Sequence, residues 1–288
     1  MQARVRTETR GTLADLVKTS RPFSWINTAY VFAAGAHLGA GWSAGVLLGT
    51  FYFSFPFNLL LYGINDLFDY ESDARNPRKN SIEGAVLAPK RLRALLTAIA
   101  ITNLPLLALL FSTGSRASAA ALAALLFTAV AYSAPPLRLK EKPVLDSFTS
   151  ATHFVLPLIV GLLYGRAGFL PWPEIAAFTL WAMASQAFGA IQDIEPDRAA
   201  GIASIATAFG ARRTAAFALT LYLAAAGIVL GIHRTPGYLL VGAVLLLYPA
   251  NVLLALRERE GARRGWRRFL WLNLLTGAAV TRAFYIGR

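Results

Sequence analysis

Between Arg21 and Asp66 the chain reads PFSWINTAYVFAAGAHLGAGWSAGVLLGTFYFSFPFNLLLYGIN, a run over residues 22–65 that contains no Asp, Glu, Lys or Arg. About 20 apolar residues of helix cross the hydrocarbon core of a bilayer, and a helix satisfies its own backbone hydrogen bonds there. The run is long enough for two such helices, and Gly39, Gly41 and Gly45 mark the turn between them. This stretch predicts an integral membrane protein.

The rest of the chain repeats this pattern of apolar runs separated by charged loops. Hydrophobic residues make up 56% of the 288 positions and charged residues only 15%, which is too apolar for a water-soluble domain of this length. Further charge-free runs cover residues 94–115, 117–137, 147–165, 175–192, 214–233 and 235–256, and a shorter run covers 269–281. We therefore predict an all-α, polytopic membrane protein with about nine transmembrane helices in one bundle.

The residue types that are missing exclude several kinds of chemistry. The chain has no Cys, which excludes disulfides, thiolate zinc sites, iron–sulfur clusters and a catalytic thiol. Its three His residues, His37, His153 and His233, are isolated in the sequence, so a His-based metal site is not expected. There is no Gly-x-x-x-x-Gly-Lys-Ser/Thr loop, so a nucleoside triphosphate is not indicated.

The distribution of basic residues predicts the orientation. A net charge of +13 would suggest nucleic acid in a soluble protein, but here the basic residues lie in short loops between apolar runs. When the runs are taken as alternating spans, 23 of the 28 Lys and Arg residues fall on one side. Positive residues are retained in the cytoplasm, so we predict a multi-pass protein of the cytoplasmic membrane with its N-terminus inside and its C-terminus outside. No cleaved signal peptide, nucleic-acid partner or obligate protein partner is inferred.

The second predicted span leads directly into a cluster of acidic residues. Asp66, Asp69 and Asp73 have the spacing i, i+3 and i+7, which places them on one face of a helix, and Asn65 lies one turn before Asp69. Three crowded carboxylates repel one another unless a cation neutralises them, and hard oxygen ligands suit Mg²⁺. The cluster predicts a magnesium site, and a solvated acidic loop is the alternative.

A second acidic cluster follows the sixth predicted span. Asp193 and Asp197 are spaced i and i+4, although Pro196 between them disturbs helical geometry. Both clusters end even-numbered spans, so they are expected at the same, cytoplasmic surface, where we place the active site. The recurrence after four spans suggests a single domain over residues 1–288 that is built from two pseudo-repeated halves, roughly 22–140 and 141–288.

Several cations are expected on the same side as the acidic clusters. The loop after the fourth span contains Pro135 and Pro136, which stiffen it and could present Lys140 to an anion. A topological role is the alternative for the loop cations, and the same ambiguity applies to Arg75, Arg78 and Arg198.

An anionic head at the surface and an apolar tail inside the membrane describe a prenyl diphosphate. Magnesium would neutralise the leaving diphosphate and favour an allylic cation, which an aromatic face such as that of Tyr132 could stabilise. The bundle offers no obvious buried carboxylate or His to recognise a polar acceptor. An ion-coupled transporter is the rival class, but transport sites usually lie near the midplane, whereas these carboxylates lie at the ends of spans.

The order and spacing of the two acidic motifs resemble the UbiA superfamily of intramembrane prenyltransferases. The resemblance implies two Mg²⁺ ions and, as metal ligands, Asn65, Asp66, Asp69, Asp73, Asp193 and Asp197. It further implies that Asp66, Asp69, Asp193 and Asp197 serve catalysis, and that the diphosphate is bound by Lys140 with Arg75 or Arg78. The lipophilic acceptor would enter sideways from the bilayer.

Within that superfamily the chain looks most like the lycopene elongases. Residues 76–84, NPRKNSIEG, replace the Arg-Pro-Leu segment that is usual after the first motif. The resemblance implies dimethylallyl diphosphate as the donor and lycopene or a related linear carotenoid as the acceptor, with C45 and C50 products. Transfer to an aromatic quinone precursor, a chlorophyllide or a glycerol ether lipid is the alternative.

Overall fold

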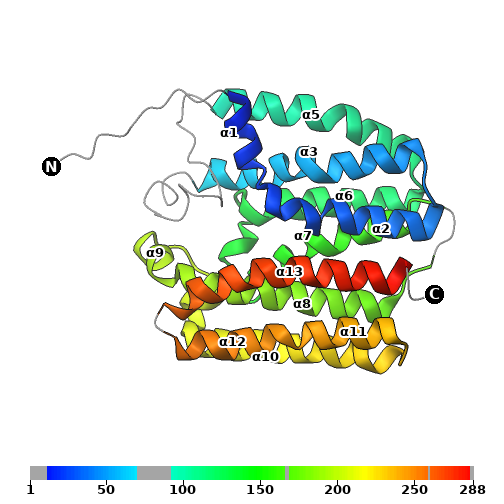
Figure 1. Cartoon of the computed structure of the whole chain (residues 1–288). Helices are drawn as coiled ribbons and strands as arrows, with labels where there is room; N and C mark the ends of the chain where they lie inside the picture. Colours follow the sequence, from blue (N-terminus) through cyan, green and yellow to red (C-terminus); the bar gives the residue numbers. More distant parts are fainter. Residues whose placement is uncertain (1–11, 70–91, 166–168, 259, 286–288) are drawn as a thin grey trace.

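The structure, a computed structural model, describes residues 12–69, 92–165, 169–258 and 260–285. Every regular element in these ranges is a helix, and the long helices lie alongside one another as one bundle (Figure 1). The predicted all-α fold is confirmed. Three residues of the predicted site, namely Asp73 of the first acidic cluster and Arg75 and Arg78 after it, lie outside the described ranges.

The helices follow one another with short connections. The first part of the chain forms α1 (Thr12–Thr19), η1 (Pro22–Asn27), α2 (Ala29–Ala40), α3 (Ala44–Phe68), α5 (Leu92–Thr113), α6 (Arg116–Ser133), η4 (Leu139–Glu141) and α7 (Leu145–Leu162). The second part forms α8 (Trp172–Ala190), η5 (Ile191–Asp193), α9 (Ile194–Ala199), α10 (Ile205–Ile232), α11 (Pro236–Leu245), α12 (Leu247–Arg257) and α13 (Gly261–Tyr285).

Each predicted span coincides with helical structure, but not every helix qualifies as a span by length and composition. Six segments of the described chain are long and apolar enough: α3, α5, α6, α7, α10 and the pair α11–α12. The last pair is one apolar segment interrupted at Leu246, because Pro249 has no N–H to donate to the carbonyl of Leu245. The helices α2, α8 and α13 fall outside this set, so the number nine is approximate.

The core consists of two large apolar clusters that meet at α7. One cluster is built mainly from α2, α3, α5 and α6, and it includes Val160 of α7. The other is built from α8 and α10 to α13, and it includes Ala151 of the same helix. In Figure 1 the helices of the first cluster lie in the upper part of the view and those of the second cluster in the lower part, with α7 between them. This arrangement suits two halves, although the internal repeat stays a prediction.

Glycines allow α2 and α7 to pack with their backbones in contact. A Cβ atom built on Gly35 would lie 2.6 Å from the carbonyl oxygen of Leu158, and one on Gly161 would lie 2.4 Å from that of Phe32. Small residues at helix interfaces permit this close approach in membranes, where packing and polar contacts hold helices together. The contact fixes α7 against the first half of the chain.

We expect Gly161→Ala to destabilise the folded protein by about 1–3 kcal/mol, because the added methyl group meets backbone atoms of α2 that cannot move aside independently. Gly231→Ala on α10 is the matched control, since a Cβ there meets nothing within 4 Å. The measurement is thermal unfolding in a mild detergent. Equal midpoints for the two variants would contradict this account of the interface.

Candidate active site

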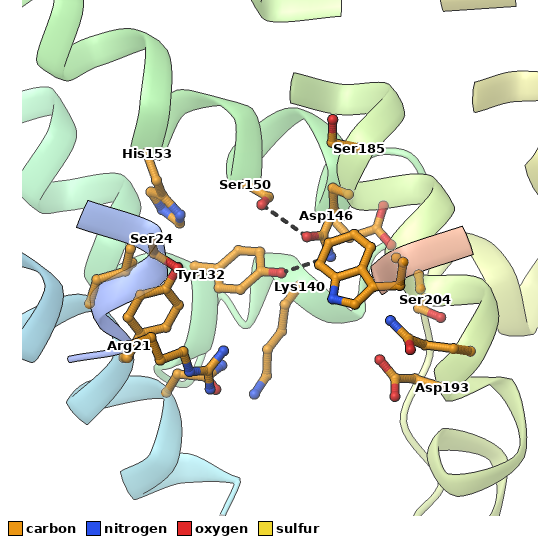
Figure 2. A pocket seen from close by; sticks show the side chains of 18 of the residues that line it. Arg21, Ser24, Tyr132, Lys140, Asp146, Ser150, His153, Ser185, Asp193 and Ser204 are labelled. Carbon is orange, nitrogen blue, oxygen red and sulfur yellow. Dashed lines mark hydrogen bonds between the residues drawn. The ribbon is translucent and has the colours of Figure 1, made fainter. Parts of the chain in front are cut away.

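A cavity of about 340 Å³ lies between the two groups of helices. Six residues that the sequence singled out line its wall: Asn65, Asp69, Tyr132, Lys140, Asp193 and Asp197. Figure 2 shows Arg21 and Lys140 on one side of this cavity and Asp193 on the other. The structure thus brings together two acidic segments that lie more than a hundred residues apart in the sequence.

The first side of the cavity mouth is the C-terminal end of α3. The Asn65 amide donates to the Ser133 hydroxyl at 3.1 Å, and the guanidinium of Arg21 donates to Asp66 Oδ1 at 3.3 Å. Asp66 is buried and does not itself line the cavity. The helix ends at Phe68, and Asp69 caps it with an N–H bonded to the Asn65 carbonyl. A common helical face for Asp66, Asp69 and Asp73 therefore stays a prediction.

Lys140 lies at the same side of the mouth, on the short helix η4. Its ammonium group forms an ion pair with Asp69, and the Lys140 side chain is only 8% exposed. Arg138, at 3.8 Å from Asp69, has a left-handed backbone conformation just before η4. A nearly buried ammonium group needs an anionic partner, so Lys140 has a local electrostatic role beyond topology. Lys142, in contrast, is exposed.

The second side of the mouth consists of η5 and the short helix α9. Asp193 and Asp197 are half-buried there and face the cavity. Pro196 is tolerated because it occupies the first turn of α9, where an N–H has no helical partner. Arg198 does not line the cavity, and its guanidinium donates to the Thr207 carbonyl at 3.3 Å. Binding of diphosphate by Arg198 therefore stays a prediction.

Sequence reasoning missed Arg21 as a residue of the site. Its guanidinium stacks on the ring of Tyr62 at 4.2 Å from the ring centroid and also pairs with Asp66. In the sequence Arg21 looks like any other basic residue before a span. Its left-handed backbone conformation, with φ of 48°, turns the chain into η1. No sequence pattern indicates that turn.

A buried carboxylate was also missed. Asp146 is 1% exposed, lines the cavity, and accepts hydrogen bonds from the backbone N–H groups of Ser147 at 2.6 Å and Ile205 at 2.7 Å. It thereby ties the start of α7 to the start of α10. The expectation that the bundle offers no buried carboxylate or His for a polar acceptor was wrong, because Asp146 and His153 are both buried and line the cavity. An acidic residue at the start of an apolar run was the available signal.

The deeper wall of the cavity combines a few polar groups with large aromatic rings. The amide of Gln186 donates to the Tyr132 hydroxyl at 3.3 Å and accepts from the Ser150 hydroxyl at 3.0 Å (Figure 2). Trp181, on the same helix as Gln186, stacks with Phe269 of α13 with ring centroids 6.0 Å apart, and both rings line the cavity. The cavity therefore changes from charged at the mouth to mostly apolar in its depth.

The acidic residues of the mouth are divided between its two sides. Within the described residues, no three His, Asp or Glu side chains stand close enough to form a metal site by themselves. The donor atoms are carboxylate and amide oxygens, which are the ligands that Mg²⁺ prefers. This donor set fits magnesium, provided that an anionic ligand between the two sides completes the coordination.

The sequence of the chain is similar to the sequences of known proteins. Residues 23–275 match the model of the UbiA prenyltransferase family, so the chain belongs to that family. It is 46% identical over 286 residues to a C50 β-cyclic carotenoid biosynthesis protein of Dietzia sp., covering 96% of this chain and 66% of that protein. It is 42% identical over 275 residues to a lycopene elongase/hydratase of Corynebacterium glutamicum, covering 92% of this chain and 94% of that one.

Solved structures share the fold at lower sequence identity. A UbiA homologue from Archaeoglobus fulgidus, bound to dimethylallyl diphosphate and Mg²⁺, matches with a TM-score of 0.71 at 20% identity. The match covers 94% of this chain and 99% of that one. A homologue from Aeropyrum pernix matches with a TM-score of 0.68 at 19% identity, covering 94% and 97% of the two chains.

We expect Lys140→Met to weaken binding of a prenyl diphosphate by about 1.5–3 kcal/mol, the scale of a hydrogen bond to a charged group. Lys142→Met, which removes an exposed cation two residues away, is the matched control. Binding is measured by calorimetry with a non-hydrolysable donor analogue in detergent. Unchanged affinity in Lys140→Met would leave this residue a role in folding or topology only.

Proposed function

We propose that this chain transfers a dimethylallyl group from dimethylallyl diphosphate to a linear carotenoid, with lycopene as the best candidate. One observation carries the proposal: a single cavity has both acidic segments and Lys140 at its mouth and aromatic rings in its depth. An anionic head with an apolar tail fits this gradient. The names of the two bacterial relatives support a carotenoid as the acceptor.

Two Mg²⁺ ions are proposed at the mouth. Their ligands would be Asn65, Asp66, Asp69 and Asp73 on one side and Asp193 and Asp197 on the other. When bound, magnesium neutralises charge on the diphosphate as it leaves. The Archaeoglobus structure with dimethylallyl diphosphate and Mg²⁺ supports this part of the proposal.

The chain's own side chains would position the donor and protect the cation. Lys140 compensates phosphate charge beside Asp69, and Arg21 does so beside Asp66. Arg75, Arg78 and Arg198 remain proposed as further diphosphate contacts. Aromatic faces such as that of Tyr132 stabilise an allylic cation, and the large rings of the deeper wall limit the access of water to it.

The acceptor is proposed to enter from the bilayer, because a carotene is soluble there and not in water. An aromatic quinone precursor, a chlorophyllide or a glycerol ether lipid would enter the same way. We favour the carotenoid on the strength of the relatives, because the buried polar groups of the cavity wall, such as Asp146 and His153, would also suit an acceptor with a carboxyl or hydroxyl group. An ion-coupled transporter is less well supported, because the carboxylates lie at helix ends.

Membranes that contain the chain, lycopene, dimethylallyl diphosphate and Mg²⁺ should form C45 and C50 carotenoids, detected by mass spectrometry. Asp193→Asn should reduce this yield at least about a hundredfold while the protein still inserts, because it removes a charged metal ligand. Prenylation of 4-hydroxybenzoate or a naphthoate by the same membranes, with lycopene unchanged, would refute the carotenoid acceptor and leave the family assignment intact.

We also propose that the mouth of the cavity faces the cytoplasm. The helix α1 and the C-terminal end of α13 lie at opposite ends of the bundle, which suits an odd number of crossings (Figure 1). The described start of α13, which lies at the same end of the bundle as α9, carries Arg263, Arg264, Arg267 and Arg268.

A single cysteine added as a reporter after Arg288 should therefore lie outside the cytoplasm, and one inserted between α12 and α13 should lie inside. The measurement is labelling of single cysteines by an impermeant reagent in intact cells, which is clean because the parent chain has no Cys. Protection of the C-terminal cysteine from the reagent, together with labelling of the one between α12 and α13, would contradict the proposed orientation.

A further inference from the structure

The imidazole of His153 occupies an unusual position in the wall of the cavity. The residue is 3% exposed, and its Nε2 atom is buried without a hydrogen-bond partner among the described residues. The ring packs edge-to-face on Tyr132, with centroids 5.2 Å apart and an interplanar angle of 86°. Buried polar atoms nearly always have partners, so Nε2 is available to bind a group that enters the cavity.

The other titratable groups on the cavity wall already have partners. Both oxygens of Asp146 accept backbone hydrogen bonds, and Asp69 is paired with Lys140. The hydroxyl of Tyr132 accepts from Gln186. Asp193 and Asp197 stand at the mouth, where metal and diphosphate are proposed. Among the described lining residues, His153 is therefore the base best placed to receive a proton deep in the cavity.

We propose that His153 Nε2 accepts the proton that ends the reaction. This inference rests on the proposed function. The double bond at the end of the acceptor attacks the dimethylallyl carbon as diphosphate leaves, which forms one C–C bond and leaves a tertiary cation. A C–H bond next to that cation then breaks, its electron pair forms a new double bond, and the proton passes to Nε2. The imidazolium returns the proton to solvent through the mouth.

The same nitrogen also accepts the proton when the tertiary cation captures water and a hydrated product forms. In that case a water oxygen bonds to the cationic carbon, one O–H bond of the water breaks, and the proton again passes to Nε2. A neutral imidazole suits both outcomes because its lone pair is available without a change of net charge before the cation forms.

The position of His153 along α7 fits this step. His153 follows Asp146 by seven residues, which correspond to about 10 Å along the helix, so His153 lies two turns further along α7 than Asp146. The tertiary cation forms beyond the new C–C bond, on the side away from the diphosphate. A base for it is needed in the depth of the cavity rather than beside the metal ligands.

The test separates ionisation of the donor from removal of the final proton. Donor labelled with oxygen-18 at its bridging position reports ionisation when the label moves to non-bridging positions, and mass spectrometry of carotenoids reports product. His153→Phe, which keeps a ring against Tyr132, should lose about 100-fold or more in product, with label movement within threefold of the parent. In His153→Ala, added imidazole should restore part of the product.

His37→Phe is the matched control, because His37 stacks on Trp42 outside the cavity and should leave both readouts unchanged. A His153→Phe variant that forms product within threefold of the parent would overturn the inference. So would a parallel fall of both readouts without rescue by imidazole, which indicates a structural role. A parent protein that forms no elongated carotenoid would contradict the proposed function and this inference with it.

Discussion

Carboxylates crowded at the edge of a membrane repel one another strongly, because the surrounding medium screens charge poorly. The structure places a cation beside each described aspartate of the first side, with Arg21 next to Asp66 and Lys140 next to Asp69. These ion pairs hold η1 and η4 against the end of α3. The geometry of the mouth therefore depends on the compensation of the aspartate charges by these two cations. The same cations are placed where they would meet a diphosphate.

Much of this arrangement follows from the sequence by simple rules. The apolar runs predicted the positions of the long helices, and the parity of the spans predicted that Asp69 and Asp193 lie at the same end of the bundle. Both rules depend on the membrane, which permits few backbone conformations. The substrate class followed from the combination of carboxylates, cations and an apolar bundle.

Other features could not be predicted because they depend on tertiary contacts. The pairing of Arg21 with Asp66 requires a left-handed turn before η1, and nothing in the local sequence demands it. His153 looks isolated in the sequence, yet the packing of α6 and α7 brings it against Tyr132 on the cavity wall. The break at Leu246 was missed although Pro249 was visible, because an apolar run was counted as one continuous helix.

The ends of helices also contribute to the electric field at the mouth. Asp69 caps the C-terminus of α3, where unpaired carbonyl groups carry a partial negative charge, whereas Asp146 meets the N-terminus of α10 through the N–H of Ile205. The peptide dipoles therefore add negative potential on the α3 side and positive potential at the start of α10. The carboxylate of Asp146 already pairs with the positive end of α10, whereas the negative end of α3 favours a divalent ion. The backbone itself therefore makes the α3 side of the mouth the more attractive one for a metal ion.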